Sequence, residues 1–430
     1  MSPDAHWRRN LFAITGACFI GFTGFTLVMP FLPLYLTQLG LTDVGDIAFW
    51  SGISLGITPA ITAFLSPVWG RLSDRYGRKI MVERSLICFV ITMVVFAYVT
   101  KPWHVFAIRA FQGLFAGYGA LGLAMAAESA PPGKMASAIG MVQTAQRLGP
   151  ALGPVIGGVL AQFVGLRNAF FFASAFYLIG LLLVFFMYHE PRTPAEVAAS
   201  AKAKEGAEKK RVTFKNVLAF EHFVLLMGVI FAVQVVDKSL GPILPLYIAE
   251  LGVTPERVPI VSGILFSVLA ATASVGHHLT GKMLKTRPPR TIIATVSAIA
   301  GVAILLFVWQ PPIAVLNAAI AIFGVTVGIG MTAAYATAGG TLPHNARATG
   351  FGFLTSASLA GLAAAPMASG FIAARSIRLV FALDAVLLAL VAAVVVRAMS
   401  ASFRVDAARK PATEEEEIED KGEALVASEE

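Results

Sequence analysis

Charged residues are scarce in this chain. They make up 13% of its 430 residues, whereas a typical soluble domain carries about 25%. Hydrophobic residues make up 57%, and the few charges lie between long apolar runs. A chain of this composition has too few polar side chains to cover a water-soluble globule, so the sequence indicates lipid as its main solvent.

Cysteine and the common catalytic motifs are also scarce or missing. The two cysteines, Cys18 and Cys88, lie in apolar runs, so we expect them to pack rather than to form a disulfide. The sequence contains no G-x-x-x-x-G-K-S/T phosphate loop, no H-E-x-x-H or G-x-S-x-G motif and no paired His/Asp cluster. These absences argue against a nucleotide-driven pump and a membrane enzyme, and we predict no enzymatic activity, cofactor or metal site.

Twelve apolar segments approach the roughly 20 residues that a helix needs to cross the hydrocarbon core. They are residues 11–37, 47–69, 80–100, 103–127, 137–163, 168–188, 222–249, 259–281, 291–309, 312–338, 348–373 and 379–399. The predicted fold class is therefore an all-α integral membrane protein with twelve transmembrane helices.

Lysine and arginine set the predicted orientation, because they gather in the cytoplasmic loops of membrane proteins. If both termini are inside, the outer loops hold five of the 33 basic residues and the spans hold four. The five are Lys101, Arg167, Arg257, Arg375 and Arg378, and the four are Arg84, Arg109, Arg147 and Lys238. The remaining 24 lie in inner loops and tails. We therefore predict a multi-pass cell-membrane protein with cytoplasmic termini, and the net charge of +8 does not indicate a nucleic acid partner.

Two polar stretches divide the chain. Residues 190–216 are basic and rich in alanine, and we interpret them as a cytoplasmic linker between an N-terminal bundle (1–189) and a C-terminal bundle (217–403). Residues 404–430 contain the run T-E-E-E-E-I-E-D and little apolar matter, which predicts an acidic, disordered cytoplasmic tail.

The two halves repeat each other at an offset of 211 or 212 residues. PFLPLYLTQLG (30–40) aligns with PILPLYIAELG (242–252), and Arg167 aligns with Arg378. Similar composition alone would not keep rare proline, tyrosine and arginine residues in register across five spans. We therefore predict two pseudo-symmetric six-helix bundles, a substrate site between them near the membrane midplane, and alternating access by rocking.

The segment GRLSDRYGRK (70–79), between the second and third spans, resembles the G-x-L-a-D-r-x-G-r-k signature of the major facilitator superfamily. The resemblance covers about residues 10–400. It implies that this loop locks the two halves together on the cytoplasmic side, and a plain basic turn is the alternative. The predicted gate residues are Gly70, Asp74, Arg75, Gly77, Arg78 and Glu128.

Two further motifs resemble the same family. RAFQG (109–113) is similar to its R-x-x-q-G motif, which implies a role of Arg109 in proton coupling, with a structural ion pair as the alternative. GPALGPVIGG (149–158) contains G-x-x-x-G-P-x-x-G-G, which is associated with antiporters in this family. Its residues are Gly149, Gly153, Pro154, Gly157 and Gly158. The alternative interpretation is that these small residues only let helices pack closely. In that case the motif does not indicate the direction of transport.

Polar side chains inside the spans need water or a partner, because an arginine or lysine in lipid costs about 2.5–3.5 kcal/mol. Such side chains form stripes on spans four, five and seven, which by the resemblance surround or flank a central cavity. The predicted substrate and proton pathway consists of Arg109, Gln112, Gln143, Gln146, Arg147, Gln234, Asp237 and Lys238.

Asp237 is the hypothesised proton carrier, because it is the only carboxylate near the middle of a central span. The alternative is a fixed ion pair with Arg109, Arg147 or Lys238. Asp384 in the peripheral twelfth span and His277 near the inner end of the eighth are expected to be structural.

These features predict a secondary active transporter of the drug:proton antiporter branch that exports small amphipathic or drug-like molecules by alternating access. A symporter or facilitator for a sugar, a peptide or an anionic metabolite is the alternative, because buried cations suit an anionic solute. The expected partners are a small-molecule substrate and the lipid bilayer, with protons as the coupling ion and a monomer as the working unit.

Overall fold

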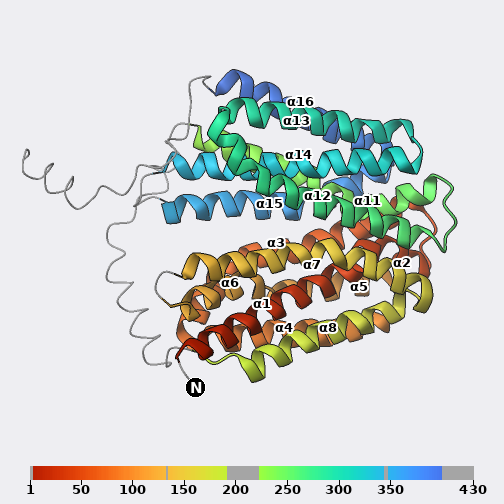
Figure 1. Ribbon diagram of the computed structural model, residues 1–430. Helices are drawn as coiled ribbons and strands as arrows, with labels where there is room; N and C mark the ends of the chain where they lie inside the picture. The colour runs from red at the N-terminus through yellow and green to blue at the C-terminus, as the bar shows by residue number, and fades with distance from the viewer. Residues whose placement is uncertain (1–2, 132–133, 191–221, 343–346, 400–430) are drawn as a thin grey trace, which may run out of the picture.

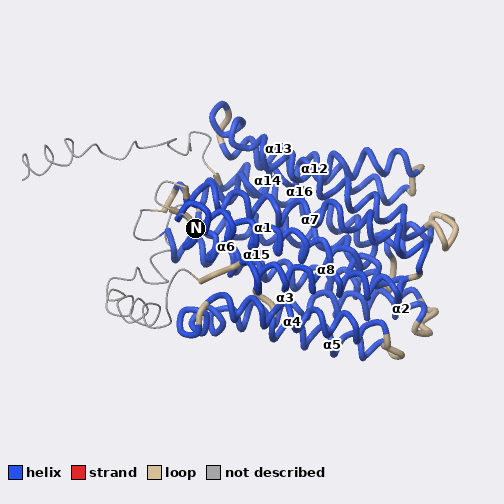
Figure 2. Tube along the Cα trace, turned by 60° about the horizontal axis from the view of Figure 1, so that its bottom comes forward, coloured by secondary structure: helices blue, strands red, loops and turns tan. Residues whose placement is uncertain are grey.

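The computed structural model describes residues 3–131, 134–190, 222–342 and 347–399. All regular secondary structure in these ranges is helical. Twelve helical spans in the described chain are long and apolar enough to cross a membrane, which confirms the predicted fold class. The helices run side by side along one direction, and the loops gather at the two ends (Figures 1 and 2).

The N-terminal bundle forms six spans, of which the first and the fourth are interrupted. Its elements are α1 (Pro3–Val28), η1 (Met29–Phe31), α2 (Leu32–Gln38), α3 (Val44–Tyr76), α4 (Arg78–Ala97), α5 (Pro102–Phe115), α6 (Tyr118–Ser129), α7 (Met135–Val164) and α8 (Leu166–Met187).

The C-terminal bundle forms the other six spans. Its elements are α11 (Phe223–Glu250), α12 (Val258–Thr286), α13 (Pro289–Leu305), η3 (Leu306–Trp309), α14 (Ile313–Gly340), α15 (Arg347–Ala373) and α16 (Ile377–Ala398). The predicted linker, apart from Glu190, and the predicted acidic tail lie outside the described residues.

The two bundles repeat the same buried contact. In the N-terminal bundle the Tyr35 hydroxyl donates to the Phe96 carbonyl oxygen at 2.6 Å, and the Tyr35 ring meets the Phe170 ring edge-on at 4.9 Å. Tyr247 makes the matching hydrogen bond at 2.6 Å to the Phe307 carbonyl oxygen and the matching edge-on ring contact at 4.9 Å. The internal sequence repeat is therefore a repeat of tertiary structure.

Two pairs of helices make the most extensive contacts between the bundles: α3 with α15, and α7 with α12. We call the end of the molecule that carries the N-terminus the near end and the opposite end the far end (Figure 1). A Cβ atom added to Gly158 of α7 would lie 2.7 Å from the Pro259 carbonyl oxygen, and one added to Gly52 of α3 would overlap the backbone of Pro366. Both contacts belong to the far-end halves of these helices, so the bundles touch backbone to backbone there.

The near-end halves of the same helices are apart. A Cβ atom added to Gly70, Gly140, Gly281 or Gly352 would meet no atom within 4 Å. These glycines belong to α3, α7, α12 and α15 in turn, the same four helices that touch at the far end. The structure therefore shows a conformation that is closed at the far end and open at the near end.

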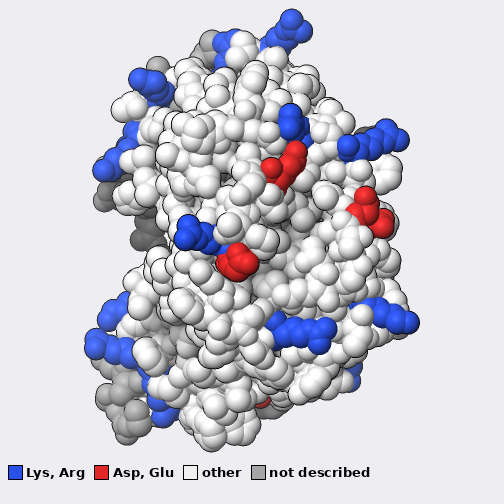
Figure 3. All heavy atoms as spheres, turned by 90° about the vertical axis from the view of Figure 1, so that its right-hand side faces the viewer, with Lys and Arg blue, Asp and Glu red and all other residues white. Residues whose placement is uncertain are grey.

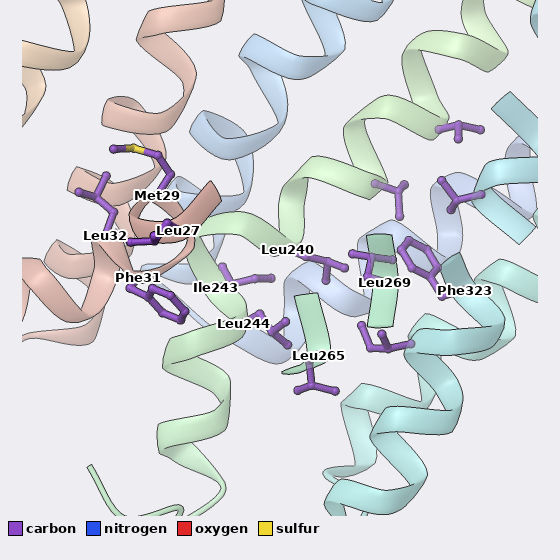
Figure 4. Close-up of a cluster of buried hydrophobic side chains, with 14 of the residues drawn as sticks. Leu27, Met29, Phe31, Leu32, Leu240, Ile243, Leu244, Leu265, Leu269 and Phe323 are labelled. Carbon is purple, nitrogen blue, oxygen red and sulfur yellow. The ribbon is translucent and has the colours of Figure 1, made fainter. Parts of the chain in front are cut away.

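An apolar plug fills the far-end contact (Figure 4). We define the plug as Leu27, Phe31, Leu240, Ile243, Leu244 and Leu265, all of which are buried. The Phe31 ring lies within 2.9 Å of a Cβ placed on Gly157 and within 3.4 Å of one placed on Gly263. It therefore lies between α7 of one bundle and α12 of the other. The far-end surface carries scattered charged side chains, some of them basic and acidic neighbours, among uncharged ones (Figure 3).

Substitution of Gly158 by valine is expected to open the far end. The added side chain would press on the backbone of Pro259 and Ile260, and such overpacking costs about 1–3 kcal/mol, which shifts the open-to-closed ratio by about 5- to 150-fold. Spin labels at Phe163 and Glu256 would report the change as a longer distance in double electron–electron resonance. Gly140→Val is the matched control on the same helix, and an unchanged distance in Gly158→Val would contradict the assigned contact.

Candidate functional site

A cavity of about 740 Å³ lies between the two bundles. Its wall is mainly apolar and aromatic, with Phe22, Phe25 and Tyr118 from the N-terminal bundle and Phe266 and Leu269 from the C-terminal bundle. The Phe22 and Tyr118 rings pack against each other with 5.4 Å between their centroids. Such a surface suits planar or apolar ligands, because aromatic faces offer a large apolar area and attract cations and other rings.

The interruption of the fourth span shapes one side of this cavity. The helix stops at Phe115 and restarts at Tyr118. Gly117 between them has a φ of 133°, which residues other than glycine rarely adopt. The Arg84 guanidinium donates to the Phe115 carbonyl oxygen at 3.2 Å, and Gln146 donates to the Gly119 carbonyl oxygen at 2.8 Å. Irregular backbone at membrane depth is tolerated where it lines a cavity or has such partners.

Arg109 is almost completely buried, with 1% of its surface exposed. Its guanidinium donates to the Ser54 carbonyl oxygen at 3.1 Å and to Gln112 Oε1 at 2.9 Å, and it lies 5.3 Å from the centre of the Phe25 ring. No carboxylate of the described chain lies within ion-pair distance of it. The cation is therefore stabilised by carbonyl and amide oxygens and an aromatic face, and the predicted ion-pair alternative does not describe Arg109.

Asp237 pairs with its own neighbour in the chain. Its Oδ2 lies 2.5 Å from Lys238 Nζ, and both residues line the cavity together with Gln234 on the same helix. Arg147 faces them from α7, exposed in the cavity. Because Lys238 neutralises Asp237, the cavity retains the positive charges of Arg147 and Arg109.

The structure places six of the eight predicted pathway residues in the cavity wall and two outside it. Six of them line the cavity: Arg109, Gln146, Arg147, Gln234, Asp237 and Lys238. Gln112 is fully buried behind Arg109 and donates to Thr92 Oγ1 at 2.8 Å. Gln143 is exposed on α7 and does not contribute to the wall. It lies four residues before Arg147, toward the near end of α7, so the stripe leaves the cavity at that point.

The glycine-rich motif of α7 packs against α1 with one face of the helix and against α12 with another. Gly149, Gly153 and Gly157 recur every fourth residue and meet the backbone or side chains of α1 within the same bundle. Pro154 and Gly158 face α12 of the other bundle. The Val155 N–H donates to Ser267 Oγ across the same interface at 3.2 Å. The motif therefore joins the first span to the inter-bundle contact.

The predicted gate motif is folded back onto its own bundle. Gly77 has a φ of 94° and separates α3 from α4. The Arg78 guanidinium lies 3.0 Å from Glu128, and the Arg78 N–H donates to Glu190 Oε1 at 2.6 Å. Arg75 stacks over the neighbouring Tyr76 ring at 5.3 Å. The Asp74 side chain lies outside the described residues. These contacts connect α4, α6 and the end of α8, all in the N-terminal bundle.

His277 is a cavity residue that sequence reasoning placed elsewhere. It lines the cavity wall, as Arg147 does, and its Nδ1 lies 2.6 Å from Thr332 Oγ1 of α14. The predicted eighth span ended at residue 281, which put His277 near its inner end. The helix α12 extends to Thr286, so His277 lies more than two turns inside it.

Exchange of Arg109 for lysine is expected to destabilise the fold. An ammonium cannot satisfy Ser54, Gln112 and the Phe25 face together, and the loss of hydrogen bonds from a buried charge amounts to about 2–3 kcal/mol. Thermal unfolding in detergent would show the loss. Arg147→Lys, at an exposed position in the same cavity, should stay within about 0.5 kcal/mol of the parent protein. Equal melting temperatures for the two variants would refute this account of Arg109.

Comparison with known proteins agrees with this architecture. The model of the Major Facilitator Superfamily matches residues 14–349. The chain is 33% identical over 282 residues to the "Multi-drug resistance efflux pump PmrA homolog" of Lactococcus lactis, covering 66% of this chain and 68% of the relative. It is 32% identical over 301 residues to "Multidrug resistance protein MdtG" of Rahnella sp., covering 70% and 71%.

A solved structure shares the fold. A bacterial homologue of the human lysosomal transporter Spinster, in an inward-facing and occupied conformation, superposes with a TM-score of 0.74 over 93% of this chain and 97% of that chain, at 18% identity. The family match, the twelve spans and the two-bundle repeat lead to one conclusion. The chain belongs to the Major Facilitator Superfamily, as its sequence motifs predicted.

Proposed function

We propose that this chain is a secondary active transporter that exports small amphipathic molecules by proton-coupled antiport. The observation that carries the proposal is the cavity of about 740 Å³ between the bundles. Its volume falls within the roughly 300–1,000 Å³ of sites that hold drug-sized ligands. Its wall combines aromatic faces with a few charged groups, a pattern that accepts many amphipathic guests. The relatives named as multidrug resistance proteins support the same substrate class.

We place the near end of the molecule in the cytoplasm. Among the described residues, basic side chains gather in and beside the loops of that end, for example at Arg75, Lys79, Lys282 and Lys285. Positive charge marks the cytoplasmic side of membrane proteins. The open conformation then admits substrate from the cytoplasm or the inner leaflet, while the apolar plug prevents return from outside. Closure of the near end with opening of the far end would release the substrate outside. A cell-membrane monomer suffices for this cycle, because one chain forms the whole cavity.

Protons supply the proposed driving force. One proton that crosses a membrane at about 100 mV releases roughly 2.3 kcal/mol, which supports a substrate gradient of about 50-fold. Asp237 is the carboxylate that faces the cavity. Asp237 pairs with Lys238 when it is ionised. When Asp237 takes up a proton, the pair breaks and Lys238 becomes able to bind a different anion. We propose Asp237 as one proton acceptor on the pathway, with Arg109 holding the fourth span in place beside it.

The excess positive charge of the cavity favours one alternative, the uptake or passive movement of an anionic metabolite. The two functions differ in their response to a proton gradient. An antiporter accumulates substrate in vesicles that are acidic inside, whereas a proton symporter accumulates it when the outside is acidic.

Cells that produce the protein are expected to accumulate less of an amphipathic fluorescent dye than control cells. A protonophore should abolish the difference, because it removes the driving force while leaving the protein intact. Right-side-out and inside-out vesicles would then show the direction of transport. Dye levels that respond to the protein but not to the protonophore would exclude proton coupling.

Replacement of Asp237 by asparagine is expected to reduce proton-driven efflux by about tenfold or more, since the neutral side chain neither binds a proton nor pairs with Lys238. Dye binding, measured by fluorescence anisotropy, should persist because asparagine has nearly the same size and the aromatic faces of the wall are unchanged. Gln143→Ala, at an exposed position outside the cavity, is the matched control. Undiminished efflux with an unchanged pH profile in Asp237→Asn would remove this carboxylate from the mechanism.

A further inference from the structure

A carboxyl group is buried inside the C-terminal bundle, away from the cavity. Asp384 lies on α16, seven residues from the start of a 22-residue helix, and 6% of its surface is exposed. Its Oδ2 lies 2.5 Å from Oγ of Ser239, a residue of α11 that is 2% exposed. We expected Asp384 to be structural, and the hydrogen-bond partner of its side chain in the described chain is the neutral hydroxyl of Ser239.

No cation of the described chain lies within ion-pair distance of Asp384. The helices packed against α16 are α11, α13 and α15, with η3 at the far end. The described side chains of α15 and η3 include no ionisable group. The ionisable residues on the remaining elements are Asp237, Lys238, Tyr247 and Glu250 on α11, Arg290 on α13, and Arg378 and Arg397 on α16 itself.

Each of the nearby basic groups is engaged elsewhere or is distant. Lys238 pairs with Asp237 on the cavity side of α11, and Arg378 pairs with Glu250 at 3.6 Å at the far end. Arg290 donates to the Val396 carbonyl oxygen, twelve residues along α16 and therefore about 18 Å away along the helix axis. Arg397 follows Val396 on α16 and is therefore further still from Asp384. A carboxylate at Asp384 would thus have no compensating charge in an apolar interior.

The hydrogen bonds of Ser239 indicate that Asp384 carries a proton of its own, in addition to the hydroxyl proton of Ser239. Ser239 Oγ lies 2.9 Å from the Val236 carbonyl oxygen and 2.5 Å from Asp384 Oδ2. A serine hydroxyl has one proton and can donate it to only one of these acceptors. Both contacts are satisfied if Asp384 is a neutral acid that donates to Ser239, which in turn donates to Val236.

The fold does not need a carboxyl group here. By the internal repeat, Asp384 corresponds to Ala173 of α8, which is fully buried, and Ser239 corresponds to Leu27 of α1. The same packing position in the other bundle is therefore occupied by small or apolar side chains. An acid at this position and a hydroxyl opposite it belong to the C-terminal bundle alone.

We propose that Asp384 and Ser239 form a proton-binding site in the C-terminal bundle, loaded in the conformation that is open at the near end. Ser239 directly follows the cavity residues Asp237 and Lys238 on α11, so a movement of α11 that reshapes the cavity also moves Ser239 relative to Asp384. In that step the acid O–H bond breaks, its electron pair stays on the carboxylate oxygen, and the proton passes to water of the cavity. The coupling part of this proposal rests on the proposed antiport.

Infrared spectroscopy of the purified protein tests the proton site without any transport assay. The wild type at neutral pH should show the C=O stretching band of a protonated carboxylic acid, which moves on transfer to D2O. Asp384→Asn should remove the band, while Asp237→Asn should keep it. Ser239→Ala should shift the band, because the acid loses the oxygen to which it donates. A wild-type spectrum without the band, or a band that survives in Asp384→Asn, would overturn the site.

Transport in proteoliposomes then tests coupling. Asp384→Asn imitates the neutral acid and should still exchange substrate at equal pH on both sides. It should lose the substrate gradient of about 50-fold that one proton supports at 100 mV. If it lacks the infrared band yet accumulates substrate as the wild type does, the coupling role is wrong. If the wild type itself ignores the proton gradient, antiport is wrong, and the infrared result alone decides the proton site.

Discussion

Direct contact between helix backbones is the constraint on which the rest of this structure depends. On α7, Gly149, Gly153 and Gly157 bring the helix against α1, and Gly158 brings it against α12 of the other bundle. Within lipid there is no hydrophobic force between helices, so close packing and hydrogen bonds must hold them together. Side chains at these positions would separate the backbones. Because the close contacts lie at the far end, the plug seals that end and the cavity remains open on the other.

The second requirement is that each polar group within lipid has a partner. Arg109 meets it with carbonyl and amide oxygens and the Phe25 ring, and the interrupted fourth span meets it through Arg84 and Gln146. These partners come from four neighbouring helices, α1, α3, α4 and α7, so they also fix the cavity wall. Two of these helices, α3 and α7, also form the main contact between the bundles. A change from one open end to the other must therefore reshape the binding surface. In this way the packing links substrate binding to access.

Much of the fold was predictable because its signals are local. Apolar runs of helix length predicted the twelve spans, and the repeated prolines and tyrosines predicted the matching bundles. The interruption of the fourth span was not predictable. Gly117 aligns with Gly328, where α14 continues unbroken, so the same residue type occurs in both contexts. The locations of His277 in the wall and of Gln143 outside it depended on how far each helix extends and rotates, which residue spacing defines only loosely.

The sequence by itself determined the class of the molecule: its solvent, its spans, its doubled architecture and the family to which it belongs. Composition and periodicity express these properties because each span must satisfy the bilayer separately. Only the tertiary structure decided the partners of the buried charges. Asp237 pairs with Lys238, Arg109 has no carboxylate partner in the described chain, and Asp384 meets the hydroxyl of Ser239. The energy of a buried charge depends on atoms a few ångströms away, and those atoms belong to helices far apart in the chain.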